Sequence, residues 1–197
     1  MSRWVITAEP TARIPELAKV PARFTVDRTL DVARSGGRFT LAERVLPAPW
    51  DKDYDALPGE GPAAWGERFD LTGWGFLAAR IGGRCIGGAV VAPGPPSGGP
   101  WLMDIRVTPR HRRTGVGSAL FAEAVRWTAE QGFDRLRIET QNNNVAACRF
   151  YARQGCTLIA AARGAYPSLP DEVRLIWHKT LSPQPEGVAD AQGQGRF

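Results

Sequence analysis

The chain has 197 residues, a length that fits one large domain better than two very small ones. Hydrophobic residues make up 43% and charged residues 23% of it, which argues against a wholly disordered chain and a bundle of membrane helices. The net charge of +5 suggests an anionic partner: a phosphorylated cofactor, nucleic acid or an acidic surface. Three cysteines without paired spacing and two histidines argue against a disulfide framework and a zinc site.

The sequence predicts no targeting or membrane segment. The first ten residues lack an apolar run long enough for a signal peptide, and the uncharged stretch 85–103 contains four prolines, which a spanning helix would not carry. We therefore expect a cytoplasmic protein without a membrane partner. Residues 1–181 are predicted to form one domain, with an irregular part over 1–73 and a motif-bearing core over 74–181. Residues 182–197, rich in Pro and Gly, are predicted to be disordered.

The first part of the chain predicts strands and one long loop. The strands are expected over residues 24–30, 39–45, 74–79, 85–91 and 101–107. The third and fourth form a hairpin that turns at Gly82-Gly83, because two apolar runs flank a Gly-Gly turn. The loop is expected over residues 47–65, which are rich in Pro, Trp and Asp.

Helices and strands then alternate. Val116, Leu120, Ala124 and Trp127 recur with helical spacing, so a helix is predicted from Gly115 to Glu130. The other elements are strands over residues 135–140, 156–162 and 173–178 and a short helix from Asn144 to Gln154. This order predicts an α/β fold with a mixed, mostly antiparallel sheet and helices on both faces.

A glycine-containing loop joins the strand at 101–107 to the helix after it. Such a turn leaves backbone N–H groups unpaired at a helix N-terminus, where the dipole favours an anion. Gly115 and Gly117 would let a phosphate approach the backbone closely. A Rossmann dinucleotide-binding loop is excluded, because its pattern requires a third glycine at the position of Leu120. The lack of Lys excludes a nucleotide P-loop. Positive charge is expected around the phosphate from Arg106, Arg110, Arg112 and Arg113. A basic surface loop is the alternative interpretation.

A second motif lies in the segment IETQNNNVAACRFYARQGC, after the strand at 135–140. Asn144, Ala147 and Tyr151 are separated by three and four residues, so they share one face of a helix. A small residue at position 147 leaves room for a ligand chain, with an amide at one end of the strip and a phenol at the other. The alternative is an ordinary amphipathic helix with a core tyrosine.

Together the two motifs resemble the GNAT superfamily of N-acetyltransferases. The first matches its Arg-x-x-Gly-x-Gly pyrophosphate loop, and the second its Asn-x-x-Ala pattern with a following Tyr and Gly. The segments IETQNNNVAACRFY and DEVRLIWHK look like the streptothricin acetyltransferase branch. The similarity is strong over residues 101–181 and faint before Trp74, although PAPWDKDYD resembles an acidic segment of these enzymes. Cys156 replaces the usual Phe, and Asp104 is the only carboxylate left in the strand before the glycine loop.

The resemblance implies a GNAT fold and acetyl transfer from acetyl-CoA to a primary amine of a small molecule. It implies direct attack in a ternary complex, with no metal, and a streptothricin-like antibiotic as one acceptor. The family's tyrosine, here Tyr151, would donate a proton to the sulfur of CoA. The residues expected to contact acetyl-CoA are Ile105, Val107, Arg112, Arg113, Thr114, Gly115, Val116, Gly117, Ser118, Asn144, Ala147 and Tyr151.

A base is also required, because a lysine-like amine has a pKa of roughly 10.4 and is protonated at neutral pH. Glu139, on the strand that leads to Asn144, is the first candidate, and Asp104 is the second. Either carboxylate could act through water or be a surface residue without a catalytic role. Cys148 is less attractive as a covalent nucleophile, because no His is near it in the sequence.

Charge is divided along the chain. Between Leu41 and Gly75 there are seven acidic and three basic residues, whereas between Asp104 and Arg137 there are four acidic and seven basic ones. A basic half for an anionic cofactor and an acidic loop for a cationic acceptor would suit acetylation of a polyamine-like antibiotic. The alternatives are a protein N-terminal or lysine acetyltransferase and a non-catalytic acetyl-CoA-binding module. A nucleic-acid partner is not expected, because no aromatic residues interleave with the arginines. A homodimer is left open.

Overall fold

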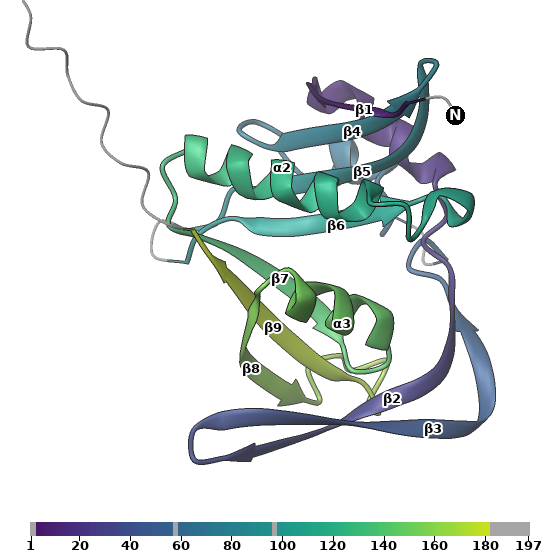
Figure 1. The fold of residues 1–197 in the computed structure, drawn as a ribbon, viewed down its shortest axis with the longest axis vertical. Coiled ribbons are helices and arrows are strands. Elements are labelled where there is room, and N and C mark those ends of the chain that lie inside the picture. Colours follow the sequence, from purple (N-terminus) through teal and green to yellow (C-terminus); the bar gives the residue numbers. More distant parts are fainter. Residues whose placement is uncertain (1–2, 57–58, 96–97, 182–197) are drawn as a thin grey trace, which may run out of the picture.

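The computed structural model describes residues 3–56, 59–95 and 98–181, so the predicted tail at 182–197 lies outside the described residues. Most of the strands form one seven-stranded sheet with the order β1-β4-β5-β6-β7-β9-β8 (Figure 1). All neighbours in this sheet are antiparallel except β6 and β7, which are parallel. Its strands are β1 (Val5–Glu9), β4 (Gly75–Ile81), β5 (Arg84–Ala92), β6 (Trp101–Val107), β7 (Arg135–Gln141), β8 (Thr157–Arg163) and β9 (Val173–Thr180).

Helices cover both faces of this sheet, as predicted. The helices α2 (Val116–Glu130) and α3 (Val145–Arg153) pack on one face, and the 3-10 helix η1 (Thr11–Lys19) and the short α1 (Trp65–Arg68) pack on the other (Figure 1). The apolar side chains of β4 alternate between the two cores, because successive residues of a strand point to opposite faces. In the part of the chain that the structure describes, no helix is both long and apolar enough to cross a membrane.

The residues of α2 that recur with helical spacing pack into the larger of the two cores, as predicted. Val116, Leu120 and Ala124 are buried, and Trp127 packs at the rim of the same cluster. Trp127 lies directly over β4, where a Cβ on Gly75 would come within 2.6 Å of its ring. The glycine therefore allows the close approach of helix and strand.

The N-terminal part corrects the sequence analysis, because residues 1–73 are more regular than predicted. β1 and η1 were not expected, and the two strands at 24–30 and 39–45 are the cores of much longer ones, β2 (Phe24–Ser35) and β3 (Arg38–Lys52). These two strands pair as a separate antiparallel hairpin that wraps around the lower end of the molecule in Figure 1.

Proline explains why the last part of β3, from residue 47 onward, was predicted as a loop. Val26 pairs with Trp50 and Arg28 with Val45, so residues 46–49 bulge opposite a single residue of β2. Pro47 and Pro49 both lie in that bulge, where no ladder hydrogen bond is lost by the missing N–H groups. β3 therefore runs through a segment whose composition is typical of a loop.

Candidate active site

The sheet splits between its two parallel strands. β6 and β7 pair only at Trp101 with Arg137 and at Leu102 with Ile138, and beyond these pairs the strands diverge (Figure 1). On the other side of β6, Leu102 pairs with Val91 and Asp104 with Val90, which leaves Met103 as the extra residue of a β-bulge. A bulge bends its strand and increases its twist. The bulge at Met103 thus coincides with the start of the opening.

The edge of β6 that faces the opening belongs to Ile105 and Val107. The Thr108 N–H donates to Ile86 O of β5 at 2.8 Å, so the alternate residues 107 and 105 direct their peptide groups to the opposite edge. Arg112 Nε donates to Val107 O at 3.0 Å and occupies that carbonyl. The peptide groups of Ile105 and the N–H of Val107 remain at the edge, where an extended ligand could pair as an added strand.

The loop before α2 forms an anion-binding concavity. Arg113 and Gly115 have positive φ angles, of 62° and 91°, which turn successive peptide groups toward one side. The six consecutive backbone N–H groups of residues 113–118 have no hydrogen-bond acceptor among the described residues. The side chain of Val116 is buried, so this residue offers only its N–H, and the Thr114 hydroxyl donates to His111 O at 2.7 Å. This geometry suits a diphosphate at the helix N-terminus.

Two features of this loop differ from the expected charge cluster. Arg106 lies on the face of β6 opposite Ile105 and Val107 and pairs with acidic groups, so it does not contribute to the loop. The Arg112 guanidinium donates to the carbonyls of Val107 and, at 3.4 Å, Pro21. Arg106 is therefore not part of the expected cluster, and the remaining charges, on Arg110, Arg112 and Arg113, lie in the same loop as the N–H groups.

Gly117 provides a test of this concavity. A Cβ on Gly117 would lie 3.8 Å from both Phe150 and Val107, which is ordinary van der Waals contact, so the fold itself accepts a Cβ there. We expect Gly117→Val to lower the affinity for CoA about 10-fold to 100-fold by covering the N–H groups that are expected to hold the phosphate. Isothermal titration calorimetry measures the affinity, and the control is Ala122→Val, which places the same valine side chain on the exposed face of α2. An unchanged dissociation constant would contradict the assignment.

The helix α3 borders the opening from the other side. Asn144 is its N-cap: the side-chain oxygen accepts from Ala147 N–H at 3.1 Å, and its Nδ2 donates to the hydroxyl of Tyr54 at 3.2 Å. Ala147 is half-buried on the face that also carries Tyr151. Gln154, at the far end of the helix, donates to the Ser118 hydroxyl at 3.0 Å and ties α3 to α2. The predicted strip of Asn, Ala and Tyr is therefore present as one helix face.

Tyr151 is 5% exposed and packs between Phe121 and Phe150, whose ring centroids lie 5.8 and 5.3 Å from its own. Its hydroxyl forms no side-chain hydrogen bond within the described part of the chain. Burial, and secondarily the charge of Asp104, raises the pKa of Tyr151. The phenol therefore carries its proton at neutral pH, as a proton donor must.

The two predicted carboxylates lie just past the split on the face of the sheet away from α3. Ile105 and Val107 pack in the core that contains α2 and α3, so the side chain of Asp104, the neighbour of Ile105 in β6, points to the other face. In β7, Leu136, Ile138 and Thr140 are buried, and Glu139 points away from them. Asp104 and Glu139 thus belong to one face and Tyr151 to the other.

The two carboxylates, Asp104 and Glu139, have different surroundings. The Asp104 side chain is 11% exposed and bonds to Arg106, which also donates to Asp55 Oδ2 at 2.6 Å and to Val20 O at 3.1 Å. Burial raises the pKa of Asp104, although the Arg106 charge opposes the shift. Glu139 is exposed and accepts a hydrogen bond from the Tyr166 hydroxyl at 2.7 Å. An amine could therefore reach Glu139 more easily than Asp104.

Three further polar residues, Tyr54, Gln141 and Tyr166, lie next to Glu139 and Asn144 and were not among the predicted site residues. The Tyr54 hydroxyl donates to Gln141 Oε1 at 2.5 Å, and Gln141 Nε2 donates to the Tyr166 hydroxyl at 2.9 Å. The only sequence signal for them was the acidic segment around Tyr54, which resembles a segment of the family. The three residues lie on three separate parts of the chain, and only the tertiary structure brings them together.

Cys148 is not placed as a nucleophile. Its buried sulfur lies 3.4 Å from Thr140 Oγ1, and burial raises the pKa of the thiol to about 11. The thiolate is the reactive form of cysteine, so this residue acts in packing.

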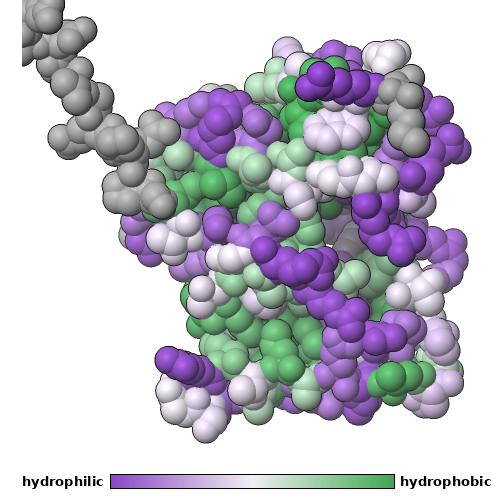
Figure 2. All heavy atoms as spheres, viewed as in Figure 1, coloured by the Kyte–Doolittle hydropathy of each residue, from purple (hydrophilic) through white to green (hydrophobic). Residues whose placement is uncertain are grey.

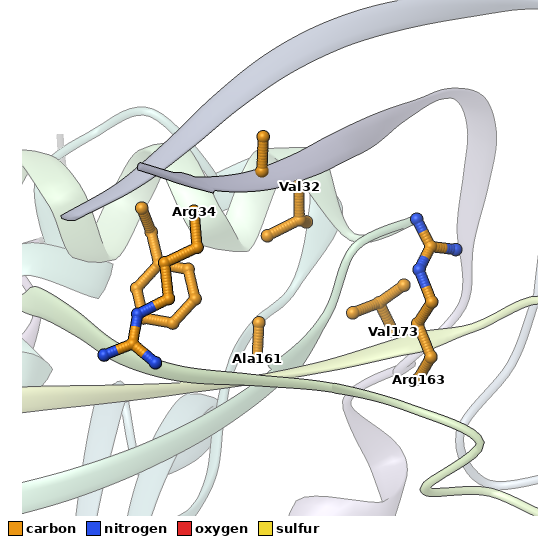
Figure 3. Close-up of a pocket in the computed structure, with 7 residues that line it drawn as sticks. Val32, Arg34, Ala161, Arg163 and Val173 are labelled. Carbon is orange, nitrogen blue, oxygen red and sulfur yellow. The ribbon is translucent and has the colours of Figure 1, made fainter. Parts of the chain in front are cut away.

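A cavity of about 220 Å³ lies away from this site, between the β2–β3 hairpin and β8 (Figure 3). Arg34 and Arg163 stand at its ends, and Val32, Ala161 and Val173 line it. It includes none of the predicted site residues and no carboxylate.

Figure 2 shows hydrophilic side chains along the side where the loop before α2 and the hairpin lie, the same side as the split.

Comparisons with known proteins identify the family of this chain. The sequence matches the Acetyltransferase (GNAT) family over residues 40–156, and the chain belongs to that family. It is an acetyltransferase, and acetyl-CoA is its acetyl donor. The chain is 34% identical over 164 residues to streptothricin acetyltransferase A of Bacillus subtilis (strain 168), covering 79% of this chain and 87% of that protein. It is 28% identical over 171 residues to a streptothricin acetyltransferase of Escherichia coli, with coverages of 84% and 90%.

Two solved structures have the same fold. One is from Bacillus anthracis str. Ames, assigned as a streptothricin acetyltransferase and solved with acetyl coenzyme A, with a TM-score of 0.76, 25% identity and coverages of 92% and 99%. The other is a nourseothricin acetyltransferase, with a TM-score of 0.72, 25% identity and coverages of 90% and 98%. The predicted fold is thereby confirmed, including the mostly antiparallel sheet.

Proposed function

We propose that this acetyltransferase acetylates a primary amine of a streptothricin-class antibiotic and so acts as a resistance factor. The observation that carries the proposal is the position of Asp104 and Glu139 just beyond the split, on the face opposite Tyr151. An acceptor on the carboxylate face and acetyl-CoA in the split would meet between a base and an acid. The relatives named above support the acceptor class.

Each group has a proposed role. The N–H groups of residues 113–118 hold the diphosphate of CoA, and the open edge of β6 at Ile105 and Val107 pairs with the amides of its arm. Asn144 and Ala147 flank that arm. Glu139 accepts the proton of the substrate ammonium, directly or through water, and Tyr151 donates a proton to the departing thiolate of CoA.

Asp104 has a different proposed role. Together with Asp55 and Glu139 it gives the acceptor face a negative charge, which attracts a polycationic antibiotic. Since Arg106 holds Asp104 and Asp55, these two carboxylates act through their position and charge rather than as bases.

The test is thiol release from acetyl-CoA with a panel of amines: streptothricin, an aminoglycoside, a polyamine and peptides with free N-terminal and lysine amines. We expect kcat/KM for streptothricin to exceed that of every other amine by about 10-fold or more, because differences in contacts with the substrate commonly give discrimination of this size. Faster turnover of a peptide would instead identify a protein acetyltransferase. CoA binding without turnover of any amine would identify a non-catalytic module.

A further inference from the structure

We infer that Tyr166 is a positioning residue for Glu139, and that it belongs to a one-directional hydrogen-bond chain that starts at the N-cap of α3. The inference rests on the proposed role of Glu139 as the base. Tyr166 lies in the loop between β8 and β9, and its half-buried hydroxyl bonds to Glu139 Oε1 at 2.7 Å. Neither the proposed mechanism nor the motifs of the sequence assign it a role.

Four hydrogen bonds connect five residues without a break. Asn144 Nδ2 donates to Tyr54 at 3.2 Å, and the Tyr54 hydroxyl donates to Gln141 Oε1 at 2.5 Å. Gln141 Nε2 then donates to Tyr166 at 2.9 Å, and Tyr166 donates to Glu139. Each hydroxyl or amide thus accepts one hydrogen bond and donates the next.

The groups at both ends of the hydrogen-bond chain determine the direction in which its hydrogen bonds are donated. At one end, the oxygen of Asn144 accepts from the backbone N–H of Ala147, which can only donate, so its NH₂ group must face Tyr54. At the other end, an ionised Glu139 can only accept, so Tyr166 must donate to it and must accept from the NH₂ group of Gln141. The orientation of both amides follows from these two constraints.

The hydrogen-bond chain connects the proposed base, Glu139, with the helix that carries the proposed acid. Gln141 is the last residue of β7, and Tyr54 and Tyr166 come from loops 87 and 25 residues away from it in the sequence. An exposed glutamate on a strand has several rotamers, and a hydrogen bond from a half-buried phenol selects one of them. The structure therefore holds the carboxylate in one place relative to α3, whose Tyr151 is the proposed acid.

A double-mutant cycle tests the inference. Tyr166→Phe removes only the hydroxyl, and we expect it to lower kcat about 10-fold to 100-fold through misplacement of the base, with the KM for acetyl-CoA unchanged. In a Glu139→Gln background the same substitution should change kcat less than 2-fold, because the carboxylate through which it acts is gone. Ser168→Ala removes an exposed hydroxyl from the same loop and should leave kcat unchanged.

The results of this cycle distinguish the positioning role of Tyr166 from the choice of Glu139 as the base and from the choice of acceptor. A Tyr166→Phe enzyme with wild-type kcat, or a double variant in which the two losses multiply, would overturn the positioning role. An unchanged kcat in Glu139→Gln alone would overturn both that role and the choice of base. If the wild type does not acetylate streptothricin, the acceptor proposal fails, and the cycle is run with the amine that gives the fastest thiol release. Circular dichroism melting confirms that each variant is folded.

Discussion

Tyr151→Phe is expected to lower kcat about 100-fold or more, the usual range for loss of a general acid. The hydroxyl is expected to matter only during turnover, because it bonds to no other side chain in the described part of the chain. Burial and the nearby charge of Asp104 raise the pKa of Tyr151, so it stays protonated across the neutral range. Thiol release with streptothricin measures kcat, and calorimetry measures the affinity for acetyl-CoA.

The affinity and the melting temperature serve as controls for this variant. Phe keeps the ring that packs against Phe121 and Phe150, so both should stay near the wild-type values. A kcat within 2-fold of the wild type would remove Tyr151 from the role of acid. A loss of acetyl-CoA affinity equal to the loss of kcat/KM would instead identify it as a binding residue.

Arg106→Met is expected to lower the free energy of unfolding by about 3 to 5 kcal/mol, because removing one partner of a buried ion pair leaves an uncompensated charge. Arg106 is 8% exposed and bridges Asp104, Asp55 and the carbonyl of Val20. Urea denaturation measures the loss. The control is Arg126→Met, an exposed ion-pair residue of α2, whose loss should change the stability far less because exposed ion pairs contribute little.

The loss should depend on pH in a defined direction. Burial already raises the pKa of Asp104, and removal of the Arg106 charge raises it further. A carboxyl whose folded pKa lies above its unfolded pKa binds more protons in the folded state, so stability increases as pH falls. The difference from wild type should therefore shrink between pH 8 and pH 5. A penalty that is constant with pH would show that lost packing, and not charge, causes it.

Local motifs allowed much of the site to be predicted. The loop at residues 112–118 and the strip of Asn144, Ala147 and Tyr151 depend on contacts between residues close in sequence, and the structure has both in the predicted conformation. The long hairpin was only partly predicted. Its second strand contains two prolines and is largely exposed, so neither its composition nor its apolar pattern is typical of a strand.

The sequence by itself determined the class of this protein, and it predicted the loop before α2 and the helix face of Asn144, Ala147 and Tyr151, because each depends on spacing within one strand, turn or helix. Only the tertiary structure decided where the sheet opens, since the opening depends on a bulge at Met103 and on how far β6 pairs with β7. It also decided that Arg106 serves the carboxylates rather than the phosphate loop, and that Tyr54 and Tyr166 meet at Gln141. The physical reason is that side-chain direction and long-range hydrogen bonds are set by packing between distant segments. The positive net charge that first suggested an anionic partner thus combines a basic loop, the proposed phosphate site, with a separate acidic face.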